Sequence, residues 1–479
     1  MPDANDEIDN GPTDASPAGV RWNVADTLLL ALLSLLALGL RLVGIGQWSF
    51  GVVEAETFRA LTQPLFAGPD SFAASGQSTY PAVFLLLRSL LEIGALPGFT
   101  EGWIRLPFAF AGCLLVPSVA LFARPQFGRG VACLSALVIA VHPGHIAASQ
   151  TADPIVFVMT LAVFAGAALL GGKRRVAVIL AVLAGACHPI GWLCGVGMLC
   201  AAATDRVVRK TPPWGWWLLL LLVIVLVPSL LDVVGMSLPL LAVIAVLIRP
   251  QLANGPNSLG LALATLGPLL VGGIWWWLGG IVVASASIAT LAPLTVLASW
   301  AVVRFWRRLH EQHAQDEHRR WVMRLLMTAP AIMLLGELAT AAFLYFAVFS
   351  GARPPWREVR NVVLAKAASG HQVEVIAARG CDVMRAYLRP RHWREPVTDS
   401  PSSLDPHPGM RVSPLPKDAV EAQQLLSLPD AMLVLQNDEL RALQNSAAGR
   451  TLVGDFVVVE VWPSPQRSGD QSVYLLQRR

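Results

Sequence analysis

Charged residues are scarce in this chain of 479 residues, where Asp, Glu, Lys and Arg together make up only 14% of the sequence. Hydrophobic residues make up 54%, and the mean hydropathy is +0.56. One soluble core cannot bury that much apolar surface, so a soluble globular protein is excluded. The sequence therefore predicts a protein whose apolar side chains face lipid.

Cysteines are few, and basic residues are not gathered in one place. Five of the six cysteines fall in apolar segments and Cys381 stands alone in the polar tail, so neither a disulfide framework nor a Cys-x-x-Cys metal pattern is present. The net charge is only +4, and Lys and Arg occur in short clusters between apolar runs. This distribution argues against nucleic acid as a partner.

The first 20 residues are acidic and contain Pro and Gly, and they lack the basic start and the cleavage site of a signal peptide. We expect residues 1–22 to form a disordered cytoplasmic tail. The first apolar run, from Thr27 to Ile45, is then expected to stay in the protein as a signal anchor.

A helix needs about 20 apolar residues to span a bilayer. Apolar stretches of about this length recur between residues 27 and 349. Short basic clusters between them mark cytoplasmic loops, which places the N-terminus inside and predicts about eleven spans. The expected spans cover 27–45, 103–123, 130–146, 154–172, 176–187, 189–204, 214–234, 237–249, 258–279, 281–303 and 322–349. The fold class is thus a polytopic α-helical membrane protein, with a transmembrane domain over 23–350 that includes an outer loop over 46–102.

Pro and charge become more frequent from residue 351, and this change predicts a small extracytoplasmic α/β domain over 351–479. Residues 395–417 are rich in Pro, Ser and Asp and predict a loop. The expected strands are Val373–Ala377, Ala431–Leu435, Phe456–Trp462 and Ser472–Leu476, and the expected helices are Trp356–Ala368 and Asp382–Leu388.

Carboxylates flank two predicted spans on what this topology makes the same membrane face. Glu54 and Glu56 lie in the outer loop, and Asp153 directly precedes the span expected from residue 154. A desolvated carboxylate can act as a general base on a hydroxyl or amine that attacks a sugar carbon. These three acids are the candidate catalytic residues.

Three arginines near that face, Arg59, Arg88 and Arg105, are candidates for holding a departing phosphate through charge-assisted hydrogen bonds. The alternative is that these arginines and acids have no catalytic role, because charged side chains beside a membrane are often only solvated at the interface. Three histidines near turns on this face, His142, His145 and His188, are either metal ligands or structural caps, and their spacing fits no standard metal motif.

The order of motifs resembles that of the GT-C membrane glycosyltransferases, which include the protein O-mannosyltransferases and the aminoarabinose transferases of lipid A. The resemblance covers residues 25–195, and the rest only in general layout. Its motifs are the acidic outer-loop pair, Tyr80-Pro81, Trp103-Ile104-Arg105-Leu106-Pro107, Phe127-Gly128-Arg129-Gly130, the segment from His142 to Gln150, and Asp153.

This resemblance implies transfer of a sugar from a polyprenyl-phosphate donor to an extracytoplasmic protein, glycan or lipid, by a multi-pass protein of the inner cell membrane. It adds Tyr80 and His145 as candidate substrate-binding residues, and it leaves a divalent metal open. Two departures stand out. Val53-Glu54 replaces the family's Asp-Glu, and Thr79-Tyr80-Pro81-Ala82 stands where the family has His-Pro-Pro.

Loss of the family's Asp leaves several functions open. Either Glu54 or Glu56 takes over as the base, or the chain is a catalytically degenerate scaffold that binds a lipid carrier or a glycan. A transporter is a third reading, but it predicts two similar halves and the sequence has no internal repeat.

Overall fold

A computed structural model gives the structure of the chain. It describes residues 22–49, 51, 54–55, 57–58, 61, 81–96, 100–203, 289–312, 336, 339–340, 343, 345–346, 355–368, 373–377, 383–384, 387, 410–415, 431–445, 447–463, 465–466, 469–470 and 472–478. The spans expected over 214–234, 237–249 and 258–279 lie outside these residues, as does most of the one expected over 322–349. The count of about eleven spans therefore stays a prediction.

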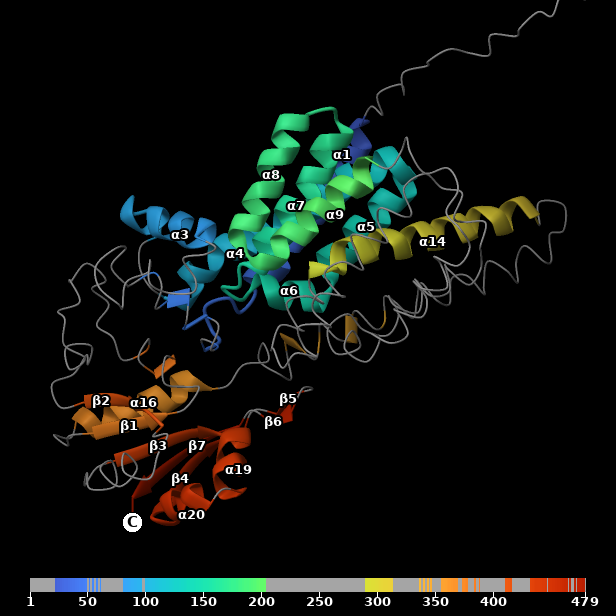
Figure 1. Ribbon diagram of the computed structural model, residues 1–479. Coiled ribbons are helices and arrows are strands. Elements are labelled where there is room, and N and C mark those ends of the chain that lie inside the picture. Colours follow the sequence, from blue (N-terminus) through green and yellow to red (C-terminus); the bar gives the residue numbers. More distant parts are fainter. Residues whose placement is uncertain are drawn as a thin grey trace, which may run out of the picture.

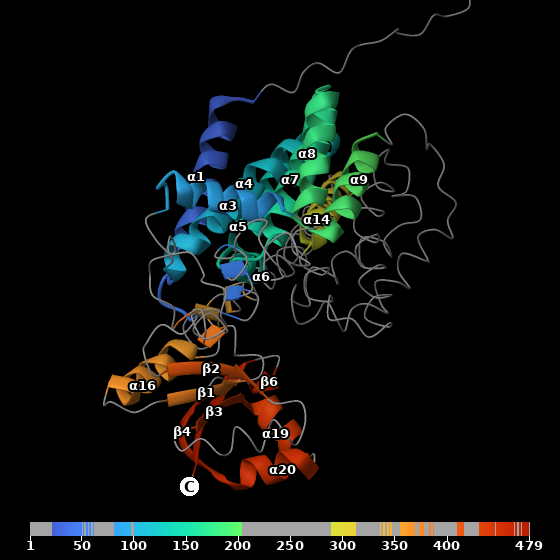
Figure 2. The same cartoon turned by 60° about the vertical axis from the view of Figure 1, so that its left-hand side comes forward.

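Apolar helices form a bundle in which α4 and α7 are central, and α3 lies at its side (Figures 1 and 2). The bundle helices and α3 are α1 (Val24–Leu42), α3 (Ala82–Glu92), α4 (Glu101–Phe127), α5 (Arg129–Val141), α6 (Pro143–Ser149), α7 (Ile155–Leu170), α8 (Arg174–Cys187), α9 (Pro189–Ala203) and α14 (Leu291–Gln312). The outward side chains of α1 and α8 are mainly Leu, Val and Ile, and this surface suits contact with lipid.

Among the described residues, α1 and α4 are by themselves long and apolar enough to cross a membrane. The span expected over 130–146 is not continuous, because α5 and α6 meet at His142 with a bend of 59°. His142 precedes Pro143, and a residue before proline is pushed out of the helical region. It has an extended backbone (φ −67°, ψ 118°), so α5 ends there and α6 begins anew.

The two ends of α4 carry buried charged clusters. Arg105 and Arg124 are 19 residues apart, which is about 28 Å along a helix and close to the thickness of about 30 Å of the hydrocarbon layer. At the Arg124 end, Asp26 is ion-paired with Arg124 (2.7 Å) and Arg129 (2.6 Å). The Arg105 end holds the candidate site, so the two clusters lie at opposite ends of α4.

The C-terminal unit, residues 356–478, is a five-stranded sheet with helices on both faces, and it lies beneath the bundle in both views (Figures 1 and 2). The strand order is β2-β1-β3-β7-β4, with β1 parallel to β2 and β3, and β7 antiparallel to β3 and β4. Its elements are α16 (Trp356–Ala368), β1 (Val373–Ala377), β2 (Met410–Pro414), β3 (Ala431–Gln436), α19 (Asn437–Asn445), α20 (Ala447–Gly454), β4 (Phe456–Trp462), β5 (Pro465–Gln466), β6 (Gly469–Asp470) and β7 (Val473–Arg478).

The central strand β3 is buried along its whole length because both faces of the sheet are covered. Met432 and Val434 join a core with Trp356 of α16, whereas Leu433 and Leu435 join a second core with Leu440 of α19. This alternation follows from the two-residue period of a strand. The core on the α16 side is continuous with that of the bundle, so the unit packs against the helices.

The loop expected over 395–417 contains a strand, and that part of the prediction is wrong. Residues Met410–Pro414 pair in parallel with β1 as the edge strand β2. Proline is tolerated at an edge because one side of the strand needs no ladder hydrogen bonds. The local composition of this segment therefore could not reveal a strand that its neighbour stabilises.

Gly191→Ala is expected to lower stability by at least about 2 kcal/mol, because overpacking a tight contact forces backbone shifts. A Cβ at Gly191 on α9 would overlap the backbone carbonyl of Ala184 on α8. Gly39→Ala on α1 is the matched control, since a Cβ there would meet nothing within 4 Å. Thermal unfolding in detergent measures both, and equal melting temperatures for the two variants would contradict this account of the α8–α9 contact.

Candidate functional site

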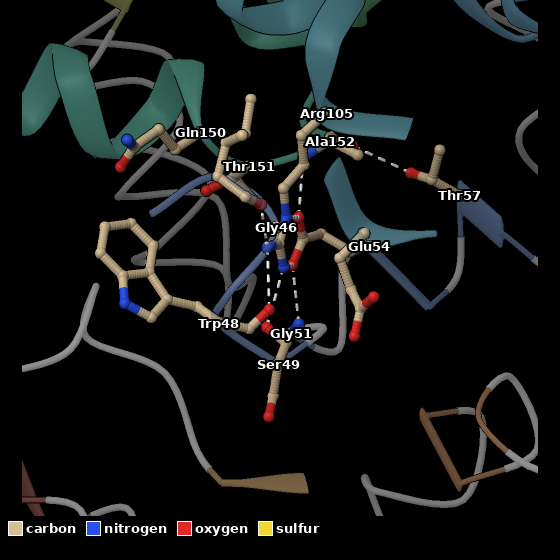
Figure 3. Close-up of polar contacts among 12 residues, drawn as sticks. Gly46, Trp48, Ser49, Gly51, Glu54, Thr57, Arg105, Gln150, Thr151 and Ala152 are labelled. Carbon is tan, nitrogen blue, oxygen red and sulfur yellow. Dashed lines mark hydrogen bonds and ion pairs between the residues drawn. The ribbon is translucent and has the colours of Figure 1, made fainter. Parts of the chain in front are cut away.

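The site is built around a fully buried ion pair between Glu54 and Arg105 (Figure 3). Arg105 donates from Nε to Oε1 of Glu54 (2.6 Å) and from Nη2 to Oε2 (2.9 Å). The carboxylate also accepts the backbone N–H groups of Gly51 (2.8 Å) and Ala152 (3.1 Å). A carboxylate offers about four acceptor positions, so these donors occupy Glu54 completely.

Arg105 also holds the outer turn, which we define as residues 45–49. Its Nη1 donates to the carbonyls of Ile45 (2.8 Å) and Trp48 (2.9 Å), and its Nη2 donates to the carbonyl of Ser49 (2.8 Å). All five N–H groups of the guanidinium are therefore used. The buried charge is paired and hydrogen-bonded, as burial requires.

Two side chains of the outer loop, Glu54 and Thr57, bind the backbone of Ala152. Its N–H donates to Glu54, and its carbonyl accepts the hydroxyl of Thr57 at 3.0 Å (Figure 3). Asp153 is the next residue, so these two bonds fix the chain at the acid. Residues separated by almost one hundred positions are thereby brought together at one end of the bundle.

Asp153 differs from Glu54 in its charged partners. None of the described contacts pairs the Asp153 carboxylate with an arginine. It is half-buried, and its Oδ1 accepts the N–H of Ile155 at 2.9 Å. Burial raises the pKa of the Asp153 carboxyl above its ordinary value, the nearby Glu54 charge raises it further, and the Ile155 N–H opposes the rise. A carboxylate of raised pKa is a better proton acceptor.

A second group of hydrogen bonds, which the sequence did not predict, joins the end of α1 to the segment before Asp153. Gln150 donates from Nε2 to the carbonyls of Leu40 (3.3 Å), Arg41 (3.0 Å) and Val43 (2.7 Å), where α1 ends. Its Oε1 accepts the hydroxyl of Tyr345 at 2.8 Å. Gln150 therefore ties the end of α1 to the segment that precedes Asp153.

Arg41 ties α1 to the bend between α5 and α6. It is fully buried and donates to the carbonyls of Ile139 (3.1 Å) and Ala140 (3.1 Å), to Ser149, and to Nδ1 of His145. An arginine within an apolar run is costly in a membrane and usually has a role, and this signal could have identified Arg41.

The histidines serve mainly to hold the turns. A guanidinium can only donate, so Nδ1 of His145 must accept from Arg41 and the ring is neutral. Nδ1 of His142 accepts the N–H of His145 (3.4 Å) at the start of α6, and Nδ1 of His188 accepts the N–H of Ile190 (3.3 Å) at the start of α9. The capping prediction is confirmed for His142 and His188, whereas the substrate-binding role of His145 stays a prediction.

The remaining candidates are placed differently. Arg88 lies on α3, where its Nε is 3.9 Å from Oε1 of Glu92 on the same helix. Its role as a phosphate ligand stays a prediction. Within the part of the chain that the structure describes, no three His, Cys, Asp or Glu side chains lie close enough to hold a metal ion. The candidates Glu56, Arg59 and Tyr80, and Val53 of the acidic motif, lie outside the described residues.

Comparison with solved structures identifies the fold. The chain is similar to ArnT from Cupriavidus metallidurans in the apo state, with a TM-score of 0.51 and 14% identity over 95% of this chain and 98% of that one. The same ArnT bound to undecaprenyl phosphate matches with a TM-score of 0.51 and 14% identity, over 94% and 98% of the two chains. The apo oligosaccharyltransferase of Archaeoglobus fulgidus matches with a TM-score of 0.52 and 11% identity, over 91% and 73%.

No protein-family profile matches the chain, and no curated protein sequence matches it significantly. The structural matches span the helical bundle and the C-terminal unit together, since they cover nine tenths or more of the chain. The resemblance that the order of motifs indicated is thus confirmed at the level of architecture. This chain is a polytopic helical membrane protein with the fold of the GT-C polyprenyl-phosphate-dependent glycosyltransferases.

Proposed function

We propose that the chain is a membrane glycosyltransferase that moves a sugar from a polyprenyl-phosphate donor to an extracytoplasmic acceptor. The observation that carries this proposal is the half-buried Asp153, whose pKa is raised and whose backbone is anchored to the Glu54–Arg105 pair. The fold supports it, because ArnT of the same architecture binds undecaprenyl phosphate.

Asp153 is the general base in this proposal. Its carboxylate accepts the proton of an acceptor hydroxyl or amine while that oxygen or nitrogen attacks the anomeric carbon of the sugar. The bond from this carbon to the phosphate oxygen breaks, and polyprenyl phosphate leaves with the electron pair. Glu54 is assigned to positioning because its acceptor positions are occupied. Glu56 stays a second candidate for the base.

The departing phosphate needs cationic partners, and Arg105 is already committed to Glu54 and the outer turn. We therefore assign the phosphate to Arg59 and Arg88, and contacts to the sugar or the lipid to Tyr80. Charge-assisted hydrogen bonds from arginine stabilise the negative charge that develops on such a leaving group.

The site is proposed to face away from the cytoplasm. Arg124 and Arg129 cluster at the opposite end of the bundle, and basic residues favour the cytoplasmic surface. A transmembrane domain over 23–350 then presents the site beside an extracytoplasmic domain over 351–479. A lipid-borne donor reaches the site sideways from the bilayer, and the acceptor arrives from water.

The test is a transfer assay with the purified full chain in lipid nanodiscs, given undecaprenyl-phosphate and dolichyl-phosphate sugars that carry a radiolabel. Membrane extracts supply lipid, glycan and protein acceptors. The expected result is label in an acceptor fraction and release of polyprenyl phosphate. Absence of both products with every donor would contradict the proposal.

The second candidate, a scaffold that binds a lipid carrier without transfer, is favoured by one observation, namely Val53 where the family has Asp. Direct binding of the labelled carrier without transfer would support the scaffold. Val53→Asp then separates the two: gain of transfer indicates a decayed enzyme, and unchanged binding without transfer indicates a dedicated binder. A wild-type chain that already transfers sugar excludes the scaffold.

A further inference from the structure

The outer turn is held by two arginines that come from opposite ends of the sequence. Arg105 of α4 binds three of its five carbonyls, those of Ile45, Trp48 and Ser49. Arg357 of α16 binds the other two, with Nη2 to Gly46 and Nη1 to Gln47, each at 2.9 Å. Every carbonyl of residues 45–49 therefore accepts a bond from a guanidinium.

Arg357 is itself fixed by the bundle. Its guanidinium donates to Oε1 of Glu101 at the start of α4, at 2.6 Å from Nη2 and 3.2 Å from Nε. Its backbone N–H donates to the hydroxyl of Ser49 at 3.0 Å. The hydroxyl of Tyr387, also in the C-terminal unit, donates to the same Glu101 oxygen at 3.1 Å. Arg357 thus connects the C-terminal unit, α4 and the outer turn.

The outer turn also packs against the chain that leads into the C-terminal unit. The ring of Trp48 lies edge-on to Tyr345, with centroids 5.3 Å apart, and its centroid is 6.0 Å from that of Phe346. Tyr345 in turn donates to Gln150. The turn is therefore enclosed between α4 and residues beyond position 340.

We propose that Arg357 is a positioning residue for the candidate site, through which the C-terminal unit holds the outer turn in the geometry that Arg105 and Glu54 require. Because Arg105 uses all of its donors, a displaced turn leaves buried donors and carbonyls without partners or moves the guanidinium. Glu54 moves with Arg105, and its bond to Ala152 carries the displacement to Asp153.

The catalytic part of this inference rests on the proposed function, but its structural part does not. Misplacement of reacting groups by about 1 Å can cost roughly 100-fold in rate. Because Arg357 acts through the turn and not on the donor, we expect kcat to fall while KM for the lipid donor changes little.

The experiment compares Arg357→Met with Arg441→Met. The matched control removes an exposed arginine on α19 of the same unit. Hydrogen exchange of peptides covering residues 45–54 is expected to speed up by about tenfold in Arg357→Met and to stay unchanged in the control. In the transfer assay, kcat is expected to fall by roughly 10- to 100-fold in Arg357→Met alone.

Arg357→Lys provides the second variant should the methionine variant fold poorly. Lysine keeps the charge beside Glu101 but lacks the planar fork that reaches two carbonyls as well, so both effects should be intermediate. Exchange in the strands of the C-terminal unit reports whether that unit is intact. Unchanged exchange over residues 45–54 in an intact Arg357 variant would overturn the inference, as would faster exchange with a wild-type kcat.

If the proposed function is wrong, the two measurements give a different combination of results. In that case the wild-type chain transfers no sugar, while exchange over residues 45–54 still shows whether Arg357 holds the outer turn. Faster exchange in the Arg357 variants of an inactive chain supports the conclusion that Arg357 holds the outer turn. It refutes only the proposed sugar transfer.

Discussion

Asp153→Asn is expected to lower the transfer rate by about 10²- to 10⁴-fold, the usual range for removal of a general base. Asparagine has nearly the same shape and can still accept the Ile155 N–H through its amide oxygen, so the turn before α7 should survive. The measurement is kcat in the nanodisc transfer assay, with thermal unfolding to verify the fold.

Glu460→Gln is the matched control for Asp153→Asn, because it neutralises an exposed acid on β4 of the C-terminal unit. It should transfer sugar at the wild-type rate. Full activity in a folded Asp153→Asn variant would remove Asp153 from the mechanism and leave Glu56 as the candidate base.

The dependence of kcat on pH gives an independent check on Asp153. The base must be ionised, so activity is lost as the pH falls through its pKa in the folded protein. Burial and the Glu54 charge raise the pKa of Asp153, and the acid limb should therefore lie above the ordinary range of an aspartate near pH 4. An acid limb at or below about pH 4 would show that another group acts as the base.

Arg105→Met is expected to destabilise the protein by about 3–5 kcal/mol, as is usual when one partner of a buried ion pair is removed. Glu54 and Arg105 are both inaccessible to solvent, and the variant leaves a buried carboxylate and three turn carbonyls without their donor. Denaturant unfolding in detergent measures the loss.

Glu54→Gln should cost less than Arg105→Met, because the amide oxygen still accepts one set of donors and the turn carbonyls keep Arg105. The double variant should lose less than the sum of the two, since both remove the same interaction. Arg441→Met is the control. Its side chain is exposed on α19, and its loss should change stability by less than about 0.5 kcal/mol. Equal losses in Arg105→Met and Arg441→Met would show that the buried pair of Glu54 and Arg105 does not stabilise the fold.

Local patterns predicted the secondary structure well wherever the stabilising contacts are close in sequence. The helix Trp356–Ala368 and the strands Val373–Ala377 and Phe456–Trp462 have the expected bounds. Alternation and helical period are properties of adjacent residues, so they can be read directly. Strand β2 was missed because it depends on pairing with β1. The break at His142 was missed because it depends on a single proline inside an apolar run.

The candidate site was predicted in part. Charge topology placed Glu54 and Asp153 on one face, and the structure brings them together through Ala152. The roles that the hydrogen bonds suggest for Glu54 and Arg105 could not be read in advance, because both residues looked equally able to meet a substrate. What separates them from Asp153 is the number of donors and acceptors around each charge.

The amino-acid sequence by itself determined that this protein lies in a membrane, since apolar runs near the thickness of a bilayer leave no other solvent for their side chains. It also determined the α/β character of residues beyond 356, through local period. Only the tertiary structure decided that Arg105 and Arg357 share the outer turn. Their partners are backbone carbonyls, and because every residue has one, no side-chain pattern can specify which of them a distant arginine will bind.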